Sequence, residues 1–133
     1  MQAQKYGRIV NLIGMFGREP AKQALPASAV NAAFMAINKG MSQIYGGDGI
    51  FVNAVDPGPT RSQRILNLFE NMAKVNNTTP EELENGFRQQ IPIGRLGEMD
   101  EVARVVTFLA SDASGNVNGT VLAVDGGMSK GLF

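Results

Sequence analysis

The sequence predicts an α/β fold with a parallel sheet, because short apolar segments alternate with longer segments of helical periodicity. Three segments, at residues 7–14, 50–55 and 120–124, are short, rich in aliphatic residues and bounded by glycine-containing turns. Near-continuous apolar runs of this length are typical of strands that are buried on both faces of a parallel sheet. Helical segments lie between these strands, and such alternation favours right-handed crossover connections.

The longest helix is predicted at residues 27–45, after a loop at residues 16–26 that contains glycine, proline and charged residues. Apolar residues recur along this helix at helical spacing and form one stripe, namely Val30, Phe34, Ile37, Met41 and Ile44. Several alanines lie between them and allow close packing against a neighbour. The Gly-Gly-Asp-Gly sequence at residues 46–49 is expected to end the helix.

Three further helices are predicted from their capping residues. Ser62 is a candidate N-cap for a helix that reaches about residue 75. Thr79 and Glu82 form a capping-box pattern, and Pro80 lies where no amide donor is needed. A last helix is expected at residues 99–109, with Asp100 and Glu101 in its first turn, where the helix dipole favours acidic groups. The side chains expected to face inward are Ile65, Phe69, Met72, Val102, Val105, Val106 and Leu109.

Length and composition indicate one globular domain that spans residues 1–133. Hydrophobic residues make up 44% of the chain and charged residues 18%, which excludes the disordered class. Twelve basic and twelve acidic residues cancel, and no basic stripe is visible, so we expect neither nucleic acid nor a membrane surface as a partner. The longest apolar run, at residues 32–37, is too short to span a bilayer.

The chain contains neither cysteine nor histidine. This excludes a Ser-His-Asp triad, a cysteine nucleophile and the common zinc sites, so no metal is expected. The absence of disulfides and of an apolar stretch behind a basic N-terminus favours a cytoplasmic protein without a secretory signal. Any acid or base must come from Asp, Glu, Lys, Tyr6 or Tyr45.

Four motifs occur in the order found in the C-terminal half of the short-chain dehydrogenase/reductase family, which the chain resembles over nearly its whole length. They are Gly-Arg-Ile-Val-Asn at 7–11, Gly-Ile-Phe-Val-Asn-Ala-Val-Asp-Pro-Gly at 49–58, Pro-Ile-Gly-Arg-Leu-Gly at 92–97 running into Glu-Val-Ala at 101–103, and Phe-Leu-Ala-Ser-Asp at 108–112 with Asn-Gly at 118–119 and Val-Asp-Gly-Gly at 124–127. Each motif is weak alone, and their common register is the specific signal.

The resemblance implies the C-terminal half of a doubly wound parallel-sheet (Rossmann-like) fold, with three strands and flanking helices. Members of the family bind NAD or NADP through a Gly-rich loop after the first strand. That unit would precede residue 1, and the glycines at 46–49 and 126–127 do not reproduce it. Residues 1–6 resemble the end of the helix that precedes this strand in the family, so we expect Met1 to correspond to an internal methionine of a longer protein.

The resemblance also locates the family's catalytic positions. Family members use Ser to hold the substrate oxygen, Tyr to transfer a proton, and Lys four residues later to lower the pKa of the Tyr. Counting without gaps from the Pro-Gly motif and from the Ser position gives the same register, in which these positions are Gly14, Ala27 and Asn31. None of the three can transfer a proton or lower a neighbouring pKa by charge. We therefore expect no catalytic residues in this chain.

A cofactor-contacting stretch is retained at residues 56–62. By resemblance, Pro57, Gly58, Thr60 and Ser62 are the candidate cofactor-binding residues, since this stretch lies against the nicotinamide in the family. Ligands of open α/β sheets bind at the carboxyl ends of the strands. Two simpler interpretations stay open, namely that Pro57 and Gly58 only turn the chain and that Ser62 is only a helix cap.

Three functions are compatible with the sequence. The chain is the C-terminal half of an NAD(P)-dependent oxidoreductase acting on a hydroxyl or carbonyl group and is inactive alone, or it is a non-catalytic interaction module, or it is a truncated product. The second alternative rests on an open strand edge at residues 9–13, and on a long helix and last strand that resemble the family's subunit interfaces. It predicts a homo-oligomer.

Overall fold

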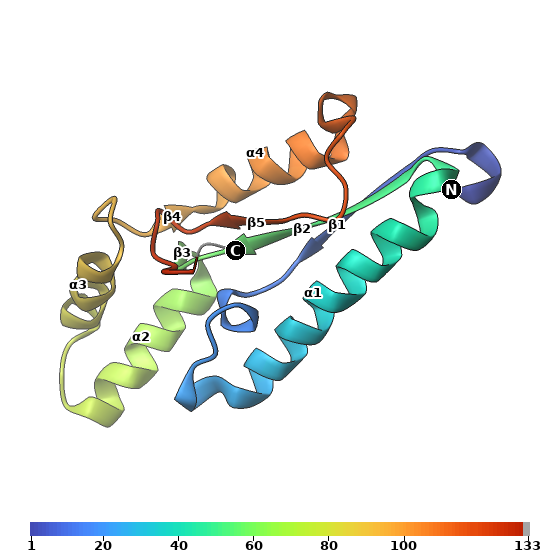
Figure 1. The fold of residues 1–133 in the computed structure, drawn as a ribbon. Coiled ribbons are helices and arrows are strands. Elements are labelled where there is room, and N and C mark those ends of the chain that lie inside the picture. The colour runs from blue at the N-terminus through green and yellow to red at the C-terminus, as the bar shows by residue number, and fades with distance from the viewer. Residues whose placement is uncertain (132–133) are drawn as a thin grey trace.

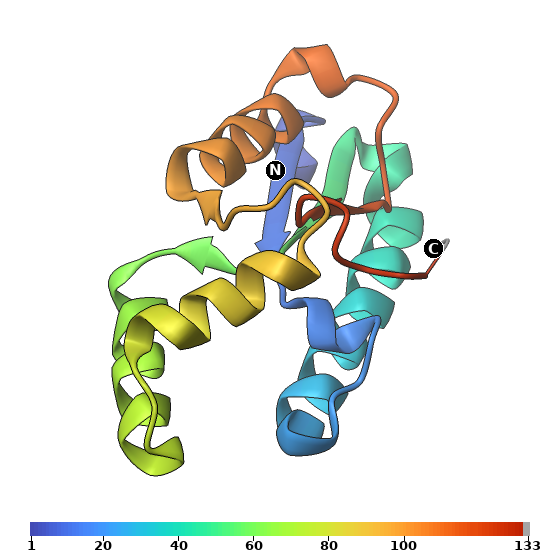
Figure 2. The ribbon, with the colours of Figure 1, turned by 90° about the vertical axis from the view of Figure 1, so that its left-hand side faces the viewer.

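The computed structural model describes residues 1–131 and shows a three-stranded parallel sheet in the order β1-β2-β5. The strands are β1 (Gly7–Leu12), β2 (Ile50–Pro57) and β5 (Val121–Val124). Helix α1 (Leu25–Tyr45) covers one face of the sheet and α4 (Met99–Ala110) covers the other (Figures 1 and 2). The predicted α/β fold with three parallel strands and flanking helices is confirmed.

Two further helices lie beyond the carboxyl ends of the strands, α2 (Gln63–Asn76) and α3 (Pro80–Gln90) (Figure 1). A second parallel pair, β3 (Thr60–Arg61) with β4 (Gly97–Glu98), connects them to the sheet. Five short 3-10 segments complete the order: η1 (Gln2–Gln4), η2 (Met15–Gly17), η3 (Lys22–Ala24), η4 (Gly46–Asp48) and η5 (Asp112–Ser114). None of the described helices is both long enough and apolar enough to cross a membrane.

The capping residues act as the sequence predicts. Thr79 Oγ1 accepts from the Glu82 amide at 3.2 Å, and Glu82 accepts from the Thr79 amide at 3.1 Å, which completes the capping box of α3. The Ser62 hydroxyl oxygen accepts from the Ile65 amide at 3.4 Å and caps α2. Helix α1 begins two residues earlier than predicted, because Pro26 fits in the first turn, where its missing amide costs no hydrogen bond.

The buried residues form two groups. The sheet centre is closed by Val52, Ala54, Val55 and Leu109, all at most 1% exposed. A second cluster between α2, α3 and the segment before β4 is built on Phe69, Ile91 and Leu96, with Ile65, Leu83, Phe87 and Met128 against it. The part of the chain beyond the strand ends therefore has a small core of its own.

Helix α1 buries polar side chains, whereas its apolar stripe is exposed. Asn38 is fully buried, and Ser28 and Ser42 are 5% exposed. Asn38 accepts a hydrogen bond from Asn11 Nδ2 and donates one to the Thr120 carbonyl, each at 3.1 Å, so amide groups join α1 to β1 and to the start of β5. The exposed members of the stripe, at 45–69%, are Val30, Phe34, Ile37 and Ile44. The uncovered apolar side of α1 bears directly on oligomer formation.

Candidate functional site

The carboxyl edge of the sheet contains the three positions that the sequence assigns to catalysis. Gly14 leaves β1 in an extended conformation, Ala27 lies in the first turn of α1, and Asn31 lies one turn later. Asn31 Oδ1 accepts from the Gly14 amide at 2.6 Å, and Asn31 Nδ2 donates to the Ala27 carbonyl at 2.8 Å. One side chain thus bridges all three positions, which are neighbours in the structure as the sequence register requires.

This arrangement provides hydrogen bonds but no proton transfer. An amide side chain does not titrate, and both of its polar atoms already bond to the backbone. The two tyrosines are elsewhere. Tyr6 donates to Asp112 at 3.2 Å near the start of β1, and Tyr45 ends α1, about 27 Å along the axis from Ala27 at 1.5 Å per residue. Neither tyrosine reaches the positions bridged by Asn31.

The candidate cofactor residues form one continuous stretch at the same edge. Pro57 is paired with Val124 in the sheet, and the Gly58 amide donates to the Val124 carbonyl at 3.1 Å. The Thr60 hydroxyl donates to the Gly58 carbonyl at 3.0 Å and holds the turn closed. Pro57, Gly58, Thr60 and Ser62 are all half-buried, and the protein gives the Ser62 hydroxyl proton no acceptor among residues 1–131. Capping of α2 therefore leaves the Ser62 hydroxyl free to donate to a ligand.

Gly58 is required by its contact with the residue that follows β5. A Cβ atom on Gly58 would lie 2.7 Å from Asp125 Cβ and 2.8 Å from its Cα. We expect Gly58→Ala to lower the free energy of unfolding by about 1–3 kcal/mol through overpacking. Urea unfolding followed by circular dichroism measures this change. Gly47→Ala is the matched control, because no atom lies within 4 Å of its added methyl group; an equal loss in both variants would contradict the assignment.

Sequence reasoning missed a buried charge next to this stretch. Asp56 is 2% exposed, and its Oδ2 lies 3.8 Å from Arg18 Nε. Burial raises the pKa of Asp56 above its ordinary value, and Asp125 and Glu19 add to this effect while Arg18 opposes it. An aspartate that directly follows the apolar run at 50–55 was the available signal.

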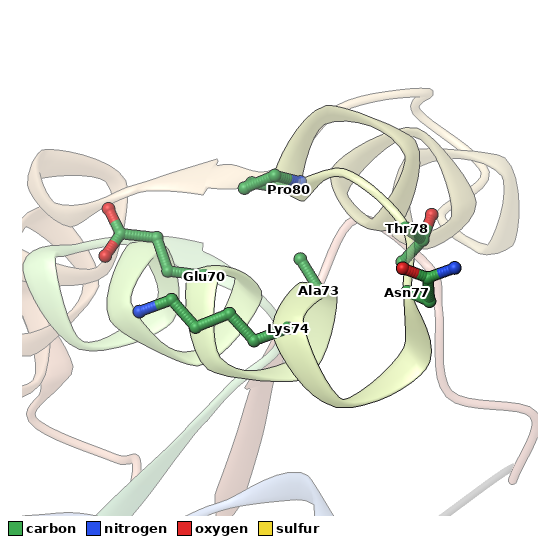
Figure 3. A pocket seen from close by; sticks show the side chains of 6 residues that line it. All are labelled: Glu70, Ala73, Lys74, Asn77, Thr78 and Pro80. Carbon is green, nitrogen blue, oxygen red and sulfur yellow. The ribbon is translucent and has the colours of Figure 1, made fainter.

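Two hollows lie between α2 and α3. One, of about 330 Å³, is formed where α2 turns into α3 and is lined by Glu70, Ala73, Lys74, Asn77, Thr78 and Pro80 (Figure 3). Another, of about 440 Å³, lies between the same two helices, and Arg61, Glu84 and Arg88 contribute to its wall. Arg61 and Arg88 both pair with Glu84, and Arg61 Nε also lies 3.7 Å from Glu98, so two carboxylates balance the two guanidinium groups. Neither hollow includes a candidate cofactor residue.

Among residues 1–131 there is no group of three or more histidine, cysteine or acidic side chains placed to hold a metal ion.

The family model described as enoyl-(acyl carrier protein) reductase matches residues 1–129. The chain belongs to the short-chain dehydrogenase/reductase family. The family match covers all four motifs on which the resemblance rests.

Individual relatives agree with this membership. The chain is 30% identical over 132 residues to the NADPH-dependent reductase BacG of Bacillus subtilis. This match covers 99% of the chain and 51% of the relative. It is 34% identical over 127 residues to an acetoacetyl-CoA reductase of Shinella zoogloeoides, covering 96% of the chain and 48% of the relative. The chain therefore spans about half the length of the curated relatives that it matches.

Solved structures give the same result. An NADPH-dependent reductase involved in bacilysin biosynthesis superposes with a TM-score of 0.92 at 29% identity, covering 98% of this chain and 50% of the other. A gluconate 5-dehydrogenase from Burkholderia cenocepacia, solved with NADP and tartrate, superposes with a TM-score of 0.84 at 28% identity. This match covers 98% of this chain and 48% of the other. The three-stranded unit is thus the C-terminal half of a short-chain dehydrogenase/reductase fold.

Proposed function

We propose that this chain is the C-terminal half of an NAD(P)-dependent oxidoreductase acting on a hydroxyl or carbonyl group, and that it is inactive alone. The observation that carries the proposal is the half-buried stretch from Pro57 to Ser62, which lies at the sheet edge beside β5 and keeps one free hydroxyl donor. Named relatives include reductases and dehydrogenases, one of them solved with NADP.

Residues 1–131 supply only part of such a cofactor site. No strand in this part of the chain is followed by a Gly-rich loop that opens a helix, so no helix N-terminus is presented to a pyrophosphate. The outer edge of β1 is unpaired in the described sheet, and this edge is where further strands would continue the order. The proposal therefore assigns pyrophosphate binding to an N-terminal half, in the same polypeptide or in a separate one.

The test is a titration that follows nicotinamide fluorescence. NADPH or NADH is titrated with this chain alone, with an N-terminal half taken from the Bacillus subtilis relative alone, and with the two mixed. We expect saturable binding in the mixture only, and weaker binding when Pro57, Gly58 and Ser62 are replaced. Absence of binding in every sample would end the proposal, and binding by the isolated chain would contradict the assignment of pyrophosphate binding to the other half.

A non-catalytic interaction module is the second candidate, and the exposed face of α1 favours it. Between Leu25 and Ile37 every exposed residue of this helix is uncharged, and Val30, Phe34 and Ile37 are about half exposed. Monomeric proteins rarely expose large continuous apolar patches, so we expect this face of α1 to be covered. We propose that in this case the chain assembles into a homo-oligomer through α1. Such assembly does not require cofactor binding.

Light scattering at micromolar concentration tests the assembly. We expect the chain to form a dimer or a higher oligomer, and Phe34→Glu to shift it to the monomer, because the charge would be buried in the contact. Leu68→Glu on α2 is the matched control, since Leu68 is equally exposed at 46% but lies outside the α1 face. A monomeric wild-type chain, or equal effects of the two variants, would count against the interaction module.

A further inference from the structure

Four charged residues meet at the carboxyl edge of the sheet, Arg18, Glu19, Asp56 and Asp125, and we refer to them as the edge cluster. Asp56 is 2% exposed, and its Oδ1 has no hydrogen-bond partner among residues 1–131. In the same part of the chain Arg18 Nε, which lies 3.8 Å from Asp56 Oδ2, has none either. Arg18 is fixed from its other side, because its Nη2 donates to the Val121 carbonyl at 3.1 Å. A buried carboxylate without donors is costly, so this side chain calls for an explanation.

Two members of the edge cluster hold the segment that follows β5. Glu19 accepts from the Lys130 amide and, at 3.0 Å, from the Gly131 amide. Asp125 accepts from the Gly127 and Ser129 amides, each at 2.9 Å, and from the Ser129 hydroxyl. Residues 127–131 are therefore held to the rest of the fold by two side-chain carboxyl groups, which accept these bonds most strongly when they are ionised.

The edge cluster contains three carboxylates and one guanidinium, so its charges do not balance. Arg18 and Glu19 come from the loop after η2, and Asp125 comes from the end of β5. Helix α1 covers the same face of the sheet but carries only one charged residue, Lys39, whose Nζ lies beside Gly119 at the other end of the sheet. Ionised Asp56 therefore repels Glu19 and Asp125, and within the described residues the ion pair of Arg18 is formed with Asp56.

The carboxylates of the edge cluster differ in how readily they take up a proton. Burial raises the pKa of Asp56, whose Oδ1 accepts no hydrogen bond from the described residues. Burial also acts to raise the pKa of Asp125, but the hydrogen bonds from Ser129 and Gly127 outweigh it and leave that pKa below its ordinary value. On acidification Asp56 is thus protonated before Asp125.

We propose that Asp56 is a charge switch that controls how tightly residues 127–131 are latched to the loop at residues 15–20. When Asp56 is neutral, Arg18 serves the two carboxylates that hold the segment, and their mutual repulsion with Asp56 is gone. We refer to the hydrogen bonds by which Glu19 and Asp125 hold residues 127–131 as the latch. When Asp56 is ionised, the latch is weakened. Since Gly58 packs directly on Asp125, the latch also acts on the stretch from Pro57 to Ser62, although the inference does not require cofactor binding.

The sign of the pH effect follows from linkage. A carboxyl whose pKa is raised by folding contributes stability that is fully present below its ordinary pKa, and this contribution is lost as the pH rises through the raised value. The latch should therefore be tighter just below the pKa of Asp56 than at neutral pH. At still lower pH it should open, because Asp125, whose hydrogen bonds hold its pKa below the ordinary value, then becomes protonated.

Amide hydrogen exchange by NMR tests the latch on the full chain, with the amides of Ser129, Lys130 and Gly131 as reporters. Asp56→Asn should raise their protection several-fold at pH 7 relative to wild type at the same pH, because the repulsion of Glu19 and Asp125 by ionised Asp56 is removed. The ratio of protection in the variant to protection in the wild type should fall towards one as the pH is lowered through the pKa of Asp56. Asp100→Asn, at an exposed carboxylate in the first turn of α4, is the matched control and should change nothing.

Arg18→Gln supplies the opposite result. It leaves three carboxylates without a cation, so protection at pH 7 should fall, and adding Asp56→Asn should recover part of it. Should Asp56→Asn not fold, the wild-type chain still decides the question, because the carboxyl ¹³C shift of Asp56 and the amide shifts of residues 129–131 should titrate with one midpoint. Separate midpoints, or a protection ratio that is the same at pH 4 and pH 7, would overturn the proposal.

Discussion

Replacing Phe69 with alanine is expected to lower the free energy of unfolding by about 3–5 kcal/mol, the usual range for a buried phenylalanine. Phe69 is 1% exposed and is the largest fully buried side chain. Its ring lies 5.2 Å from that of Phe87 at an angle of 54°, and it joins α2 to α3 and to the segment before β4. Helices α2 and α3 lie beyond the carboxyl ends of the strands (Figure 1), and this small cluster holds them together.

Urea unfolding by circular dichroism measures the effect, and the neighbouring residue gives the control. Leu68→Ala removes an apolar side chain that is 46% exposed, so a change within about 0.5 kcal/mol is expected. If the two variants lost similar stability, the cluster at Phe69 would not be the core of the α2–α3 unit. A loss confined to α2 and α3 in hydrogen exchange would show that this unit unfolds separately from the sheet.

The sequence was sufficient for most of the elements because their local signals agree with their packing. Strand β2 is apolar from Ile50 to Val55 except at Asn53, and the structure buries it between α1 and α4. The capping box at Thr79 and Glu82 defines the start of α3 without any tertiary information. Such signals lie within a few residues of the feature that they specify.

The orientation of α1 could not be predicted in the same way. Periodicity finds an apolar stripe, but it does not say which neighbour covers it. Here Asn38 and Ser42 face the sheet, since Asn38 bonds to Asn11 and Thr120, while Phe34 and Ile37 point away from it. These amide partners are separated by 27 and 82 residues along the chain. Because such distant contacts determine which face of α1 packs on the sheet, the local sequence pattern does not reveal it.

At the candidate site, the family register assigns Gly14, Ala27 and Asn31 to the catalytic positions, and it could not predict the hydrogen bonds that join them. The contact of Asn31 with Gly14 depends on how η2 packs against α1 and therefore on tertiary structure. The edge cluster was missed for the same reason, because Arg18, Asp56 and Asp125 come from three separate segments. The roles of Pro57, Gly58, Thr60 and Ser62 in cofactor binding stay predictions.

Restoring the proton relay should give the largest gain in activity. The triple variant Gly14→Ser, Ala27→Tyr and Asn31→Lys, mixed with an N-terminal half that binds the cofactor, is expected to reduce a carbonyl about 10²–10⁴-fold faster than the wild-type mixture. The exchange is sterically reasonable, since Ala27 is exposed and a Cβ on Gly14 would come closest to the amide of Asn31, 3.3 Å away, which the variant removes. The rate is read from oxidation of NADPH with an acetoacetyl thioester as the carbonyl substrate.

A second triple variant isolates the hydroxyl group from the effects of size and charge. With Ala27→Phe in place of Ala27→Tyr, the ring and the added lysine are kept, but no proton can be delivered to the substrate oxygen. We expect this variant to bind NADPH as tightly as the tyrosine variant in the mixture and to lose its gain in rate. Equal rates for the two variants would mean that position 27 does not face the reacting carbonyl, and the register that relates Gly14, Ala27 and Asn31 to the catalytic positions would then be wrong.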